Sequence, residues 1–283
     1  MSDPVRLGLF YTIIRPEEKA LLAAAEARGV ATERLADDEV TFGLDRPSGL
    51  PDVVLNRSVS HTRAVYASHV YGHYGVPVVN PAAVLELAGD KVRGSLRLAE
   101  QGIPTPRTVV ALSPEAAMKA VEEVGYPAVL KPVVGSWGRL MAKVESAREA
   151  EQLIEHKSAL ASPVHSVFYV QEYVPKPDRD LRVFVVGDRA VAAMYRHSTE
   201  WRTNAARGAT TAPAELTAEL TQLALRASAA MGGGVLAVDV MEGPHGLTVH
   251  EVNPTPEFKA LQAATGVDIA GPIIDYALEV ARR

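Results

Sequence analysis

Apolar runs alternate with amphipathic stretches in the first part of the chain. Residues 7–11 form a mainly apolar run that is typical of a buried strand, and residues 53–55 and 76–80 follow the same pattern. Residues 16–28 and 61–74 have the spacing and the boundary residues of helices. This alternation predicts a small α/β domain with a largely parallel sheet over residues 1–88.

The pattern changes near residue 88, where we expect a second unit. Asp90 is a suitable N-cap for a helix that ends at Gly102. Residues 128–144 then read as a strand, a flexible loop and a second strand, and residues 167–174 as a further strand. Helices are expected at residues 114–123 and 147–160.

Two prolines, Pro175 and Pro177, break the last of these strands and indicate a hinge before a third unit. There we expect two strands, a loop to residue 213, a helix and a hairpin. The fold class is therefore α/β, with α+β character after the first domain. Domains are predicted at residues 1–88, 89–174 and 175–283.

The predicted hairpin carries polar side chains suited to a hard metal ion. Glu251 and Asn253 lie two positions apart on a strand, so they point to the same face. The Gly- and Pro-rich residues before them favour a turn that places Asp239 beside them. Two carboxylates and an amide oxygen suit Mg²⁺, which takes its other ligands from water and substrate phosphates. A solvated hairpin with ordinary surface acids is the alternative.

Basic and glycine-containing segments offer ligands for phosphate groups. One loop combines backbone amides, a hydroxyl and a guanidinium, in Gly135, Ser136, Trp137, Gly138 and Arg139. Because a strand follows this loop, it matches neither a P-loop nor a dinucleotide-binding turn. Lys91 at a helix start and Lys131 at a strand end supply cations. An ordinary turn and solvated lysines are the alternatives.

A strand end and three arginines complete the polar set. Residues 172–174 end a strand beside the hinge, where backbone groups can pair with an adenine edge unless they belong to a core strand. Arg182, Arg196 and Arg207 lie in the third unit. Because arginine binds phosphate and carboxylate groups in a bidentate manner, we interpret them as anion ligands, with surface ion pairs as the alternative.

Composition narrows the class of protein. With 47% apolar and 22% charged residues among 283, the chain has the composition of an ordinary globular protein. Its net charge of -5 argues against nucleic-acid binding, which depends on neutralising phosphates. The lack of cysteine excludes disulfides, thiolate zinc sites and a cysteine nucleophile. Since the sequence shows no signal-peptide layout and no membrane-length apolar run, we expect a cytoplasmic protein without a membrane partner.

The order of these features resembles that of ATP-grasp ligases over essentially the whole chain. The two lysines, the glycine-containing loop, the strand end and the hairpin acids follow one another as in that family. Residues 90–91, 129–140, 168–174 and 179–187 resemble more narrowly the LysX type, the alpha-aminoadipate:LysW ligases of lysine biosynthesis. The resemblance implies an ATP-grasp fold of three domains, in which an N-terminal parallel α/β domain precedes central and C-terminal ATP-grasp domains.

The resemblance also implies residue roles. The ATP-binding set comprises Lys91, Lys131, Gly135, Ser136, Trp137, Gly138, Arg139, Gln171, Glu172, Tyr173, Val174 and Asp180. Asp239, Glu251 and Asn253 would bind two Mg²⁺ ions, and Arg182 would lie near the transferring phosphate. Arg196, Asn204 and Arg207 match positions that handle the acceptor amino acid and the carrier's terminal carboxylate.

The implied reaction is ATP-dependent amide formation. The C-terminal glutamate carboxylate of a small acidic amino-group carrier protein, of the LysW type, is phosphorylated, and the alpha-amine of an amino acid attacks the acyl phosphate. No protein nucleophile is required, which agrees with the lack of cysteine. Related ligases are homo-oligomers, and we expect one here.

Two departures from the family pattern leave the acceptor open. Glu257, Phe258 and Lys259 are followed by Ala260 where the family commonly has asparagine, and the family's Ala-Arg-Gly-Gly ends here in Ala209. Both lie where the acceptor should bind, so alpha-aminoadipate, glutamate and an unusual amino acid of a specialised pathway all stay open.

Two other functions compete with the carrier ligase. One is a RimK-like enzyme that adds glutamate to the C-terminus of a ribosomal protein, and the other is a nucleotide-binding regulator that has lost catalysis. The glycine-containing loop favours the carrier ligase over the first, and the three metal positions count against the second.

Overall fold

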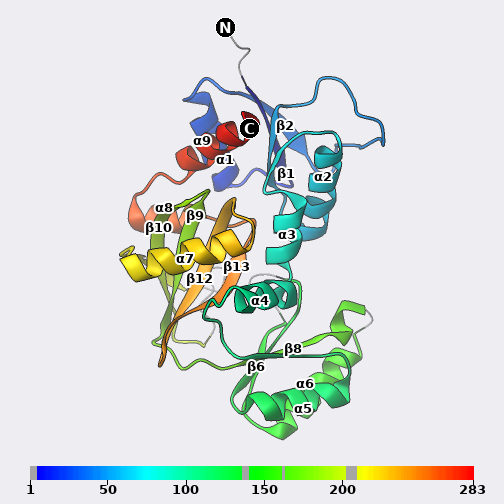
Figure 1. Cartoon of the computed structure of the whole chain (residues 1–283), viewed down its shortest axis with the longest axis vertical. Coiled ribbons are helices and arrows are strands. Elements are labelled where there is room, and N and C mark those ends of the chain that lie inside the picture. The colour runs from blue at the N-terminus through cyan, green and yellow to red at the C-terminus, as the bar shows by residue number, and fades with distance from the viewer. Residues whose placement is uncertain (1–4, 136–139, 161–162, 202–208) are drawn as a thin grey trace.

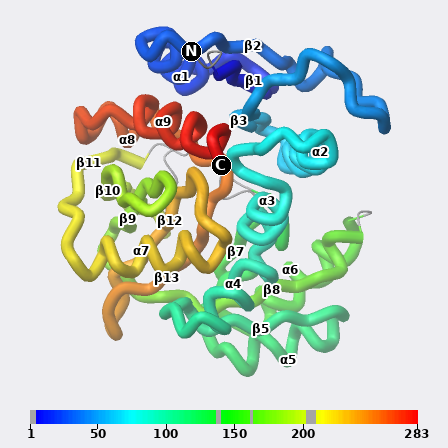
Figure 2. Tube along the Cα trace, turned by 45° about the horizontal axis from the view of Figure 1, so that its top comes forward, coloured from blue at the N-terminus to red at the C-terminus, as the bar shows by residue number. Residues whose placement is uncertain are grey.

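The computed structural model describes residues 5–135, 140–160, 163–201 and 209–283. Its strands form three sheets, and the chain visits them one after another (Figure 1). The N-terminal and C-terminal sheets lie together in one half of the molecule, and the central sheet lies at the other end (Figures 1 and 2). Within the described residues, no helix has both the length and the apolar character that a membrane span requires.

The N-terminal sheet is parallel, with the strand order β2-β1-β3-β4. Its elements are β1 (Arg6–Tyr11), α1 (Pro16–Glu26), β2 (Ala31–Ala36), β3 (Val53–Arg57), α2 (His61–His73) and β4 (Val78–Val79). The prediction of a parallel α/β sheet is confirmed. The apolar pattern missed β2, because half of the residues of this edge strand are polar and none is fully buried.

Two consecutive helices connect this sheet to the central one. They are α3 (Ala82–Gly89) and α4 (Lys91–Glu100). The predicted N-cap is confirmed, because the Asp90 carboxylate accepts hydrogen bonds from the backbone N–H groups of Val92 and Arg93 at 2.8 and 3.1 Å. Lys91 is thereby held in the first turn of α4, where we expected a phosphate ligand.

The central sheet is antiparallel, with the order β5-β8-β6-β7, and has its own apolar core. Its elements are β5 (Thr108–Ala111), α5 (Pro114–Val124), β6 (Ala128–Lys131), β7 (Ala142–Val144), α6 (Ala147–Ser158), the short 3-10 helix η1 (Pro163–Ser166) and β8 (Phe168–Glu172). The predicted strand, loop and strand unit corresponds to β6 and β7. Its loop contains residues 136–139, which lie outside the described part of the chain.

The C-terminal sheet is antiparallel, with the order β11-β10-β9-β12-β13. Its elements and the helices that follow are β9 (Arg179–Val186), β10 (Arg189–His197), β11 (Thr210–Ala214), α7 (Ala218–Ala230), β12 (Val235–Gly243), β13 (Gly246–Asn253), α8 (Lys259–Thr265) and α9 (Ala270–Ala281). The predicted hairpin is confirmed as β12 and β13. The prediction of a loop to residue 213 is wrong at its end, because β11 adds there as an edge strand.

Alternate residues of the C-terminal sheet enter two different apolar cores. Val183 and Val185 of β9 pack with α7, whereas Phe184 and Val186 pack with α8, α9 and the N-terminal sheet. Helix α9 lies beside α1 (Figures 1 and 2). The first and last parts of the chain therefore share one core, while the predicted divisions at residues 88 and 174 stay a prediction.

Candidate active site

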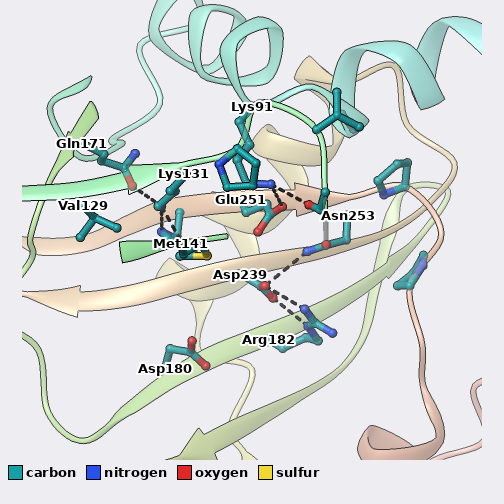
Figure 3. A pocket seen from close by; sticks show the side chains of 18 of the residues that line it. Lys91, Val129, Lys131, Met141, Gln171, Asp180, Arg182, Asp239, Glu251 and Asn253 are labelled. Carbon is teal, nitrogen blue, oxygen red and sulfur yellow. Dashed lines mark hydrogen bonds and ion pairs between the residues drawn. The ribbon is translucent and has the colours of Figure 1, made fainter. Parts of the chain in front are cut away.

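One pocket brings together every described residue of the predicted ATP-binding, metal-binding and catalytic sets, several of which Figure 3 labels. The central sheet and the segments next to it supply Lys91, Lys131, Gly135, Gln171, Glu172, Tyr173 and Val174, and the C-terminal sheet supplies Asp180, Arg182, Arg196, Asp239, Glu251 and Asn253. The remaining predicted residues, Ser136, Trp137, Gly138, Arg139, Asn204 and Arg207, lie outside the described residues.

Strand register explains why the acids and arginines converge. Asp239 pairs directly with Arg182 on one neighbouring strand and with Glu251 on the other. Residues opposite each other in antiparallel strands have side chains on the same face of the sheet. The same face carries Phe184 and Ala237 in the core that the N-terminal sheet shares. The polar site is therefore the end of an otherwise apolar sheet face.

Two arginines surround Asp239. Arg182 donates from Nε and Nη2 to the two carboxylate oxygens of Asp239 at 2.7 and 2.8 Å. Arg196 donates in the same bidentate way to Asp180, at 2.7 and 2.8 Å, and its Nη2 lies 3.2 Å from Asp239 Oδ2. Burial opposes the charge of Asp239, but Arg182 and Arg196 more than offset it and hold the pKa of Asp239 well below its usual value.

The donor set at the hairpin fits a magnesium ion. Glu251 pairs with Lys91 at 2.9 Å and is partly exposed, and Asn253 Nδ2 donates to Asp239 at 3.3 Å, which leaves its amide oxygen available. Each carboxylate oxygen can accept more than one contact, so the arginine pairs do not exclude a metal. Among the described residues, no group of three or more His, Asp or Glu side chains is arranged to hold a metal. A metal held by Asp239, Glu251 and Asn253 would therefore need water or substrate phosphates as further ligands.

Lys131 is a buried cation at the centre of the pocket. Its ammonium group donates to Gln171 Oε1 and lies 3.2 Å from His250 Nδ1. Burial lowers the pKa of Lys131 to about 7, with a further contribution from Lys91 and opposition from Glu251. Phosphate oxygens at this place would favour the charged ammonium form. The side chain of Gln171 also donates to Thr108 Oγ1, so it holds Lys131 in position.

Lys91 connects the pocket to the start of the glycine-containing loop. Its Nζ donates to Gly135 O at 2.9 Å, and its backbone N–H donates to Val133 O at 2.9 Å. Gly135 has a φ of 145°, a conformation that side-chain-bearing residues rarely adopt. The loop therefore begins against the first turn of α4, beside Glu251 of the hairpin.

The strand end at residues 172–174 is only partly available to a ligand. The backbone N–H groups of Glu172 and Tyr173 donate to Arg107 O and Pro127 O. The backbone N–H of Val174, which also lines the pocket, has no hydrogen-bond partner among the described residues. Of the three predicted positions, Val174 is thus the one that can donate to an adenine edge.

Several residues of the pocket carry no signal in the sequence. His250 is the extra residue of a β-bulge, since Asp239 pairs with Glu251 and the next residue, Val240, pairs with Val249. No pattern in the sequence indicated this bulge. Further residues that line the pocket without having been predicted include Arg15, Ser58, Lys176 and Trp201. Glu257 also lines it and belongs to the stretch that the family resemblance placed at the acceptor.

Comparison with protein families covers nearly the whole chain. Residues 88–277 match the model of the RimK-like ATP-grasp domain, and residues 7–87 match that of the LysX preATP-grasp domain. These two matches agree with the families that the sequence pattern resembles.

Named relatives are similar over most of their length. The Glutamate--LysW ligase ArgX of Sulfurisphaera tokodaii is 33% identical, with 97% of this chain and 99% of that protein aligned. The Alpha-aminoadipate--LysW ligase LysX of the same organism is 35% identical, with 89% of this chain and 91% of that protein aligned. The chain is thus similar to ligases for two different amino acids.

Solved structures agree on the fold. The RimK domain ATP-grasp protein of Sphaerobacter thermophilus superimposes with a TM-score of 0.80 at 29% identity, covering 97% of this chain and 100% of that one. A D-alanine--D-alanine ligase of Bacillus anthracis complexed with ATP has a TM-score of 0.72 at 16% identity, covers 100% of this chain and 98% of that one, and shows the fold alone. ATP-grasp ligases in general use ATP and Mg²⁺. From the fold, the pocket and these matches together, the chain belongs to the RimK-like ATP-grasp family and is an ATP-dependent ligase.

Proposed function

We propose that this ligase joins the alpha-amino group of an acidic amino acid to the C-terminal glutamate side chain of a LysW-type amino-group carrier protein. The observation that carries the proposal is that Lys91, Lys131 and Arg182 lie in one pocket with Asp239 and Glu251. The relatives named as LysW ligases, which align over almost the whole chain, support the carrier as partner.

Phosphate binding falls to the lysines and the loop between β6 and β7. Lys91 and Lys131 contact the polyphosphate of ATP, while the backbone N–H of Val174 pairs with adenine. Gly135 and the loop residues after it cover the phosphates. Cations on phosphate oxygens neutralise charge that spreads over the transferring group, which is the main demand of phosphoryl transfer.

The hairpin of β12 and β13 supplies the metal ligands in this proposal. Asp239, Glu251 and Asn253 hold two Mg²⁺ ions, which supply charge neutralisation at the phosphates when they are bound. Arg182 is fixed by Asp239 beside this position, so its guanidinium can stabilise the transferring phosphoryl group. Asp180 lies with Arg196 at the same end, and Asn204 and Arg207 belong to the acceptor and carrier site in this proposal.

The bond changes balance without a protein nucleophile. An oxygen of the carrier carboxylate attacks the γ-phosphorus, the bond to the β-phosphate oxygen breaks, and ADP leaves. The amine then attacks the acyl carbon, the bond to the phosphate oxygen breaks, and phosphate leaves as the amine loses a proton. The proposal includes the expectation that the enzyme is a cytoplasmic homo-oligomer.

Intact-mass spectrometry tests the function. A purified LysW-type carrier is incubated with the enzyme, Mg²⁺, ATP and single amino acids, including glutamate and alpha-aminoadipate, and ADP is measured in the same samples. We expect the carrier mass to rise by one amino acid minus water with one of them. A carrier that lacks its C-terminal glutamate is the control and should stay unmodified.

Two results would contradict the proposal. ADP release with an unmodified carrier in every sample would indicate another acyl substrate, and a peptide from a ribosomal C-terminus is the next to test. No ADP with any combination of substrates would contradict ligase activity at this pocket.

A further inference from the structure

The pocket continues past the metal-binding hairpin to the N-terminal sheet. Arg15 follows β1, and Ser58 follows β3, so both stand at the carboxyl ends of neighbouring parallel strands. In the order β2-β1-β3, the strand order reverses between β1 and β3, and open parallel sheets bind ligands at the carboxyl ends of the strands at such a point. Across from this edge, the segment from Pro254 to Glu257 leaves the hairpin and lines the same pocket.

Arg15 is held by Glu18 through two of its side-chain nitrogens, and its third nitrogen, Nη1, points to the segment after the hairpin. Its Nε and Nη2 donate to the two carboxylate oxygens of Glu18 at 3.0 and 2.9 Å. The Glu18 side chain is fully buried, and it also accepts from Arg57 Nε at 3.2 Å. Arg15 Nη1 instead donates to Glu257 Oε1 at 3.0 Å. The guanidinium is therefore fixed before any ligand arrives, with Nη1 at the pocket.

Among the carboxylates around Arg15, Glu257 is the one that can move away from the guanidinium. Its side chain is 44% exposed, whereas those of Glu18 and Arg57 are buried. Glu17 is also buried and accepts from the backbone N–H of Lys259. If Glu257 turns into solvent, its charge is hydrated and Arg15 keeps its bond to Glu18. The cluster is short of acceptors, because Arg57 Nη2 has no partner in the described part of the chain.

We propose that Arg15 binds a carboxylate of the acceptor amino acid and that Glu257 occupies this place until the acceptor arrives. The inference rests on the proposed function. In the proposed function the reacting phosphate lies at Asp239 and Glu251, and the nucleotide extends from there toward β8. In-line transfer then puts the carrier carboxylate on the side of the phosphorus away from ADP, and the acceptor amine reaches the acyl carbon from that end of the pocket. Arg15 and Glu257 stand at that end. A guanidinium selects a carboxylate by charge and by hydrogen-bond geometry.

Opposite effects of two substitutions test this exchange. Arg15→Ala should raise the KM for the acceptor about tenfold or more, as expected for loss of a hydrogen-bonded ion pair, with the KM values for ATP and carrier unchanged. Glu257→Gln should lower the acceptor KM, because a neutral amide competes less well for Arg15. If Arg15→Ala does not fold, Arg15→Lys keeps a cation beside Glu18 and lacks the guanidinium fork, and the same rise in KM is expected.

A matched control removes an ion pair at the other end of α1. Arg28, just after α1, pairs with Asp275 on α9 at 2.6 Å, and neither residue lines the pocket. Arg28→Ala should leave the acceptor KM as in the wild type. An unchanged acceptor KM in the Arg15 variants, a rise in the carrier KM instead, or an equal rise of the acceptor KM in Glu257→Gln would overturn the inference.

Hydroxylamine separates the failure of this inference from the failure of the proposed function. It is a small amine without a carboxylate, and it converts an activated carrier carboxylate into a hydroxamate. Arg15→Ala should form carrier hydroxamate at the wild-type rate. Hydroxamate formation together with an unchanged acceptor KM would overturn only the inference. If the wild type forms no hydroxamate, the proposed function fails and the inference fails with it.

Discussion

Two clusters in this molecule each place a buried carboxylate between two arginines, and they differ in which parts of the chain supply these residues. Asp239 lies between Arg182 and Arg196, and Glu18 lies between Arg15 and Arg57. We refer to them as the Asp239 cluster and the Glu18 cluster. In the first, every strand belongs to one sheet and the register sets each contact. In the second, α1, β3 and the segment before α8 meet from opposite ends of the chain.

This difference bears on what each cluster can do. In the Asp239 cluster each arginine is held by a carboxylate: Arg196 donates two hydrogen bonds to Asp180, and Arg182 donates two to Asp239. It can present fixed charges to a transferring phosphate. The Glu18 cluster has an unpartnered nitrogen within the described residues and a half-exposed carboxylate at its rim. It suits exchange of one anion for another.

The largest expected effect is on stability, from Glu18→Gln. Removing this charge leaves the buried guanidinium of Arg57 and the partly buried one of Arg15 without their shared carboxylate, which costs about 3–5 kcal/mol in the free energy of unfolding. Urea unfolding measures it. The surface pair Arg107–Glu123 is the control, and Glu123→Gln should cost less than about 1 kcal/mol. Equal losses in the two variants would mean that the Glu18 cluster is no more important than a surface pair.

A large effect on turnover with an intact fold is expected from Glu251→Gln. Loss of a metal-binding carboxylate should slow ADP formation about a hundredfold or more, because charge stabilisation in the transition state is lost. The control is Glu242→Gln. Glu242 lies on the same hairpin but outside the pocket, and its carboxylate accepts two hydrogen bonds from Arg179. Near-wild-type turnover in Glu251→Gln would refute its role as a metal ligand.

The pH dependence of stability sharpens the comparison further. Burial opposes the charge of Glu18, but Arg15 and Arg57 outweigh it and lower the pKa of Glu18 below its usual 4.5. A lowered carboxyl pKa stabilises the fold above the unfolded-state pKa, and this stabilisation disappears as the pH falls through the folded-state value. The stability difference between wild type and Glu18→Gln should therefore be full at neutral pH and shrink below pH 4.5. If urea unfolding shows the same difference in the free energy of unfolding at neutral pH and well below pH 4.5, the ionised Glu18 does not stabilise the cluster as described.

The smallest effect is expected for an exposed pair at the same junction. Arg28, just after α1, pairs with Asp275 of α9, and both side chains are solvent-accessible. Arg15, just before α1, pairs with Glu257 in the segment that follows the hairpin. Arg28→Ala should change the free energy of unfolding by about 1 kcal/mol or less, because water and salt screen the pair. A loss as large as that of Glu18→Gln would show that the junction, and not burial, determines the cost.

The same contrast explains how much the sequence could predict. Asp239, Glu251 and Asn253 were foreseeable because strand periodicity and one tight turn place them on one face. Arg15 and Glu257 are 242 positions apart, and only the shared core of the N-terminal and C-terminal sheets brings them together. No local pattern records that contact. His250 was missed for a different reason. A bulge changes the side of the sheet to which one residue points without changing the apolar pattern around it.

The most direct test of the division between the two clusters is a paired assay of carrier activation and amide formation. Carrier hydroxamate and carrier-linked amino acid are measured for Arg182→Gln and Arg15→Ala at an acceptor concentration below the wild-type KM. We expect Arg182→Gln to lower both products by the same factor, and Arg15→Ala to lower only the amino-acid product. If both variants lower both products in the same ratio, the Glu18 cluster has no separate role in acceptor binding, and the assignment is wrong.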